Sequence, residues 1–228
     1  MIRPKTTRKE LLKSPDEFLS LSERTALFVR EHSRQFSYLG IGIAAALFLY
    51  LAGTTYLGYV NRKGQEAFNT AYRSMSKAME PSGNQEDLDR TRELFAQVAS
   101  EYGLSKASRL VPPEMAYIRF REKNYDEAIA LYGKFLKDVP RDSPYQGLGE
   151  LALAACYEEK GDFAKSVETL KQILARPKGL FHEQAMLSLA RVYRLAHEEQ
   201  KANETLKEFL RKFAGSSFVG IARAQLKE

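Results

Sequence analysis

One stretch of the chain, residues 35–61, contains no charged side chain, and this constrains the fold more than any other feature. Its central part, residues 36–60, reads FSYLGIGIAAALFLYLAGTTYLGYV. As an α-helix at about 1.5 Å per residue it would be about 37 Å long, more than the roughly 30 Å of a bilayer's hydrocarbon core. A core helix of a soluble protein is usually much shorter, and so is the apolar segment of a cleaved signal peptide. The sequence therefore predicts an uncleaved transmembrane helix at residues 36–60.

Aromatic side chains mark both ends of this predicted span. Phe36 and Tyr38 lie at its start, and Tyr56 and Tyr59 lie at its end. Aromatic rings are enriched at the headgroup boundary of membranes, so this pattern is typical of a spanning helix. Lys and Arg are nearly equally frequent close to the two ends, and only the basic N-terminal tail as a whole favours a cytoplasmic N-terminus.

Residues 1–35 predict a basic tail followed by an amphipathic helix. Ser14, Pro15 and Glu17 match the capping box that opens a helix. Apolar residues then follow at steps of three and four through residues 18–29. Such a helix could lie on anionic lipid or run directly into the membrane span, and the sequence leaves both possibilities open.

Residues 61–228 form the third predicted part, which repeats itself. The stretches 116–140, 152–177 and 188–213 align with one another, and residues 88–103 look like a degenerate earlier copy. A small residue opens the second helix of each copy, at intervals of 36 to 38 residues: Thr91, Ala128, Ser166 and Ala202. Larger apolar residues follow four and seven positions later.

This periodicity is the tetratricopeptide pattern, in which small residues lie where the two helices of a hairpin cross. A non-repetitive helical bundle is the alternative. The predicted fold class is all-α: one N-terminal transmembrane helix followed by a solenoid of tetratricopeptide-type helical hairpins. Residues 216–227 are predicted to form a final capping helix.

The first helix of each hairpin is expected to contribute to one common binding face. An aromatic patch flanked by arginines suits a helical or extended protein segment. The alternative is that Tyr117 and Phe120 only pack against the degenerate first copy. The predicted face consists of Tyr117, Phe120, Arg121, Leu151, Glu158, Leu187, Arg191 and Arg194.

The sequence contains no recognisable catalytic, cofactor or metal motif. Cys156 is the single cysteine, and its position in a helix favours a buried thiol over a nucleophile. Neither His182 nor His197 has the second histidine of a zinc-binding helix. The net charge of +6 is spread over basic residues that alternate with acids, unlike a nucleic-acid interface. We therefore expect a protein-binding protein that is not an enzyme and uses no cofactor or metal.

The order of these parts resembles one family of membrane proteins. A basic tail, one anchor, the segment Gln65-Glu66-Ala67-Phe68-Asn69-Thr70-Ala71-Tyr72 and degenerate repeats resemble the YfgM-type proteins, ancillary subunits of the bacterial Sec translocon. The resemblance implies a single-pass protein of the bacterial inner membrane, with a cytoplasmic N-terminus and a periplasmic repeat domain. It also implies translocon subunits and periplasmic chaperones as partners. The alternative is an adaptor of the same fold that faces the cytoplasm or assembles the cell envelope.

Overall fold

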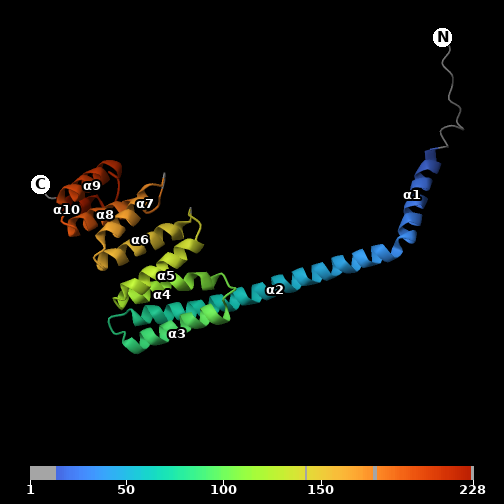
Figure 1. The fold of residues 1–228 in the computed structure, drawn as a ribbon, viewed down its shortest axis with the longest axis horizontal. Helices are drawn as coiled ribbons and strands as arrows, with labels where there is room; N and C mark the ends of the chain where they lie inside the picture. The colour runs from blue at the N-terminus through green and yellow to red at the C-terminus, as the bar shows by residue number, and fades with distance from the viewer. Residues whose placement is uncertain (1–13, 142, 177–178, 227–228) are drawn as a thin grey trace, which may run out of the picture. The chain divides into compact units, whose positions relative to one another are not determined.

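The computed structural model describes residues 14–141, 143–176 and 179–226, with side chains from Glu23 onward. All regular secondary structure in these residues is helical, which confirms the predicted all-α class. The chain divides into two compact units, Met1–Gly58 and Tyr59–Glu228. Figure 1 shows the helices of the second unit following one another as stacked hairpins.

The N-terminal part consists of helix α1, Ser14–Glu31, and the first half of helix α2, Ser33–Ala78. A single turn residue, His32, separates the two helices. The predicted cap at Ser14 lies outside the described side chains. The apolar residues 36–59 of α2 are not buried against any part of the protein, and the helix is long and apolar enough to cross a membrane.

Helix α2 continues without a break from the apolar segment into the repeat domain. At about 1.5 Å per residue its 46 residues span about 69 Å. Burial begins at Val60 and recurs at Gly64, Phe68, Ala71 and Met75, which is helical spacing on one face. This face packs on α3 (Gln85–Glu101) and α4 (Val111–Arg121) through a core that includes Phe95, Val98 and Ile118.

Three complete hairpins follow, and each pairs a first helix with a second. The first helices are α4, α6 and α8, and their partners are α5, α7 and α9. The final helix α10 packs against α8 and α9 through Ala222. The bounds are α3 Gln85–Glu101, a 3-10 turn η1 Ala107–Leu110, α4 Val111–Arg121, α5 Tyr125–Asp138, α6 Pro144–Glu159, α7 Phe163–Leu174, α8 His182–Leu195, α9 Glu199–Lys212 and α10 Val219–Gln225.

The predicted small residues do lie at the helix crossings. Thr91, Ala128, Ser166 and Ala202 are all 0% exposed. The hydroxyl of Ser166 donates to the carbonyl of Ala154 on the facing helix at 2.9 Å, which satisfies its polar group where the helices touch. The register derived from the periodicity is therefore the register of the fold.

The turns inside the hairpins share one backbone conformation. Lys123, Gly161 and His197 occupy equivalent positions and have φ of 61°, 81° and 63°. The following Asn124 and Asp162 cap α5 and α7 by accepting hydrogen bonds from backbone N–H groups three residues ahead. A left-handed residue followed by a cap thus ends one helix and starts the next within a few residues.

Candidate protein-binding face

The first helices α4, α6 and α8 carry the residues of the predicted binding face, here called the first-helix face. Ala116 of α4 and Cys156 of α6 are buried in one core with Ala128 and Tyr132 of α5. Helices α6 and α8 meet through an ion pair between Glu158 and Arg191. Between hairpins, the more extensive packing joins each second helix to the next first helix, α5 to α6 and α7 to α8.

The Glu158–Arg191 pair is bidentate. Arg191 Nε lies 2.8 Å from Glu158 Oε1, and an Arg191 terminal nitrogen donates to Oε2 at 2.9 Å. The Glu158 side chain is 10% exposed, whereas that of Arg191 is 55% exposed. The fork-to-fork geometry fixes the orientation of the guanidinium while leaving much of its surface open to a partner.

The two predicted aromatic residues of this face are half-buried. Tyr117 packs against the core formed by α2, α3 and α4, which is the degenerate first copy. Phe120 packs against the core of α4, α5 and α6, and its ring meets that of Tyr125 edge-on at 5.7 Å between centroids. Both rings therefore support neighbouring helices and present only part of their surface.

The remaining predicted residues divide into packed and polar positions. Leu151 and Leu187 are half-buried against the cores of the second and third hairpins. A terminal nitrogen of Arg194 donates to the carbonyl of Gln225 at 2.7 Å, so this arginine holds the end of α10. Arg121 is exposed and lines a shallow pocket of about 490 Å³ at the turn between α2 and α3.

Two exposed leucines on this face were not among the predicted residues. Leu148 of α6 and Leu195 of α8 have 49% and 45% of their surface exposed. Each lies at helical spacing from a predicted residue, Leu148 three positions before Leu151 and Leu195 four positions after Arg191. Extending the helical spacing by one turn at each end would have found them.

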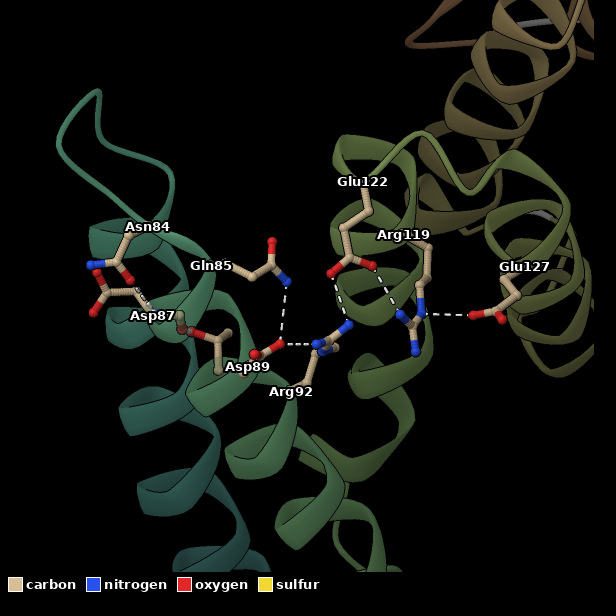
Figure 2. A network of polar contacts seen from close by, with 9 residues as sticks. Asn84, Gln85, Asp87, Asp89, Arg92, Arg119, Glu122 and Glu127 are labelled. Atoms are coloured by element: carbon tan, nitrogen blue, oxygen red, sulfur yellow. Dashed lines mark hydrogen bonds and ion pairs between the residues drawn. The ribbon is translucent and has the colours of Figure 1, made fainter.

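An ion-pair network supports the start of the face (Figure 2). Arg119 occupies the position where the other two repeats have tyrosine, and its guanidinium pairs with Glu122 at 2.9 Å and Glu127 at 2.7 Å. Glu122 also accepts from Arg92 of α3 at 2.8 Å. The network joins α3, α4 and α5, so charged side chains replace the packing that the aromatic ring provides elsewhere.

A pocket of about 770 Å³ lies where α6 begins, α7 ends and α8 begins. Arg141, Gln146, Glu150, Arg176 and Phe181 are among its lining residues. Glu150 is buried and pairs with Arg176, and the amide of Gln146 donates to it at 3.1 Å. The Gln146 side chain extends along the helix to Glu150, and the N-cap of α6 is Ser143.

Burial suppresses the reactivity of the groups between α4 and α6. It raises the pKa of the Cys156 thiol to about 12, and it also raises the pKa of the Tyr132 hydroxyl and of the Glu114 carboxyl. A thiol of this kind is protonated at neutral pH and is a poor nucleophile. Among the described residues, no group of three or more His, Cys, Asp or Glu side chains could hold a metal ion.

Comparison with known proteins identifies the repeat. The family model of the tetratricopeptide repeat matches residues 114–142, 150–178 and 184–216, one match for each complete hairpin. The three hairpins are tetratricopeptide repeats. Solenoids of such repeats present extended surfaces that act as protein-interaction scaffolds.

Solved structures agree on the fold. A Podosopora anserina protein named as a putative kinesin light chain with nearly identical TPR-like repeats superposes with a TM-score of 0.52 at 19% identity, covering 67% of this chain and 75% of that chain. A point variant of the same protein gives the same TM-score and identity, covering 67% of this chain and 76% of that chain. No curated protein matches the sequence.

Proposed function

We propose that this protein is a single-pass membrane protein whose tetratricopeptide repeats bind a partner protein through the first-helix face. The observation that carries the proposal is the division within helix α2. The apolar side chains of residues 36–59 are exposed and are not buried against any other part of the chain. From Val60 onward, the same helix packs into the repeat domain. A bilayer would cover the exposed half, and the repeats would remain in the aqueous phase.

The proposed partners follow from the resemblance to the YfgM-type proteins. They are subunits of the Sec translocon and periplasmic chaperones, with residues 1–35 in the cytoplasm, residues 36–60 in the inner membrane and residues 61–228 in the periplasm. The matching order of anchor and repeats supports this assignment. An adaptor that faces the cytoplasm, or one that assembles the cell envelope, is the second candidate, because the local charges near the span are balanced.

Orientation separates the periplasmic scaffold from an adaptor that faces the cytoplasm. Alkaline phosphatase, which needs an oxidising compartment, and a fluorescent protein that matures in the cytoplasm would each be fused after Glu228. We expect phosphatase activity and no fluorescence. The reverse pattern would assign the repeat domain to the cytoplasm and remove periplasmic chaperones from the list of partners.

Photocrosslinking in intact cells tests the binding face. A photoreactive residue at Arg191 lies on an exposed part of the first-helix face, and one at Lys134 lies on an exposed part of the second helix α5. We expect adducts with translocon or chaperone proteins from position 191 and none from position 134. Adducts from position 134 alone would place the partner on the second helices.

A further inference from the structure

The loop between α3 and α4, residues 102–110, packs against the first turn of α2 beyond the apolar segment. The backbone N–H of Lys106 donates to Asn61 Oδ1 at 2.8 Å. Ser105 is buried against Gly64, where a Cβ would lie only 2.4 Å from Ser105 Oγ, so only glycine allows this approach. These contacts hold the loop at the level of Asn61, the residue that follows Val60.

The same contacts determine which side chains of the loop are exposed. Ser105 and Ala107 are buried, and the residues beside them, Leu104 and Lys106, point outward. Leu104 has 70% of its surface exposed. Arg109 is exposed as well, and the loop contains no acidic residue.

The neighbouring turn of α2 adds positive charge and aromatic surface. The Arg62 guanidinium lies over the Tyr59 ring, 6.0 Å from its centroid. Throughout the described chain, Arg62, Lys106 and Arg109 form no ion pair. Tyr59 and Arg62 lie within two residues of Asn61 along α2, so their side chains extend from the helix at the level where the loop is held.

We propose that the loop 102–110 binds the anionic phospholipid surface of the same bilayer that residues 36–60 span. Leu104 enters the interface between headgroups and acyl chains, and Lys106, Arg109 and Arg62 bind lipid phosphates. This inference rests on the proposed membrane anchoring. The loop meets the bilayer because it is fixed beside Asn61, where the apolar segment ends, and its charge complements anionic headgroups.

A single tryptophan provides a direct test, because the sequence contains none. Leu104→Trp would be made in the full-length protein and reconstituted into nanodiscs of phosphatidylcholine, with and without phosphatidylglycerol. We expect blue-shifted emission and strong quenching by brominated acyl chains when phosphatidylglycerol is present. The double variant Lys106→Glu/Arg109→Glu in the same background should shift the emission back toward that of a water-exposed indole.

The control is Leu195→Trp, which replaces another exposed leucine at the far end of a first helix. Its emission should stay red-shifted and unquenched in both lipids. Resistance to alkaline extraction, measured on the same samples, reports separately on the anchor. If the protein resists extraction but Leu104→Trp is unquenched, the loop does not bind lipid and the anchor stands. Extraction of the protein together with an unquenched Leu104→Trp would overturn both proposals. Equal quenching of Leu104→Trp with and without Lys106→Glu/Arg109→Glu would show that the basic residues do not bind the lipid.

Discussion

At the scale of single residues, the hairpin turns show how backbone conformation constrains this sequence. Lys123, Gly161 and His197 all adopt left-handed φ values, yet only one of them is glycine. For a residue with a Cβ this conformation costs about 1–2 kcal/mol, whereas glycine adopts it freely. The three turns are therefore unequal in strain although they are equal in geometry.

Substitutions at these turns should have opposite signs. Gly161→Ala has open space around its new Cβ, so its cost of about 1 kcal/mol comes from the left-handed φ alone. His197→Gly relieves the same strain and should raise the free energy of unfolding, although glycine's greater freedom in the unfolded chain offsets part of the gain. Denaturant titration of both variants measures the two effects. Equal stability of Gly161→Ala and the native protein would contradict the argument.

The buried thiol of Cys156 makes stability depend on alkaline pH. Its folded pKa of about 12 exceeds its ordinary value of 9.0, so the folded state holds the proton more tightly than the unfolded state. The contribution of Cys156 is complete below pH 9.0 and declines as the pH rises from there toward 12. The difference in unfolding free energy between the native protein and Cys156→Ala should shrink over this range. If this difference in unfolding free energy stayed constant with pH, burial would not raise the pKa of the Cys156 thiol.

At the scale of the helices, the crossing residues set the distance between paired helices. Ala128 and Ala190 are both 0% exposed. Replacing either with leucine adds volume where the helices already touch, and should cost about 1–3 kcal/mol. Thermal unfolding monitored by circular dichroism measures this, with Ala130→Leu on the exposed side of α5 as the control. Unchanged melting of both crossing variants would contradict the repeat register.

Helices α6 and α7 are also joined by a buried charge. Arg176→Ala would leave Glu150 buried without its cation, which should cost about 3 kcal/mol or more. Adding Glu150→Gln should recover much of that loss, because the uncompensated charge is removed. Urea denaturation of the single and double variants measures the coupling between the two sites. If the double variant is no more stable than Arg176→Ala, the buried charge is not the cause.

The helices were predictable because their determinants are periodic. The spacing of Thr91, Ala128, Ser166 and Ala202 is visible in the sequence, and it placed every crossing correctly. The contacts of the candidate face were less predictable. Periodicity assigns Arg194 to a face of α8, but its bond to the carbonyl of Gln225 depends on how α10 folds back. Contacts of this kind, like that between Asn61 and Lys106, join distant residues without any repeating signal.

At the scale of the whole molecule, the single helix α2 contains both the proposed membrane span and a segment that packs in the core of the repeat domain. The sequence marks the end of the apolar segment by the charges of Arg62 and Lys63, but it does not show that the helix continues to Ala78. The continuity depends on the core around Phe68 and Phe95, which buries the second half of α2 against the repeats. This core fixes the part of α2 from Val60 to Ala78 within the second unit.

A fragment of residues 59–228 should be soluble, helical and cooperatively folded. It retains the compact second unit, including the part of α2 that packs against α3 and α4, and it lacks the exposed apolar residues 36–57. A fragment of residues 65–228 should melt at a lower temperature, because it loses Asn61, which accepts from Lys106, and Gly64, which packs on Ser105. Sedimentation after a high-salt wash and thermal unfolding would compare the two fragments. If residues 59–228 stayed in the membrane pellet after that wash, a further membrane-embedded segment would have to lie within the repeats, and residues 36–60 would not be the sole anchor.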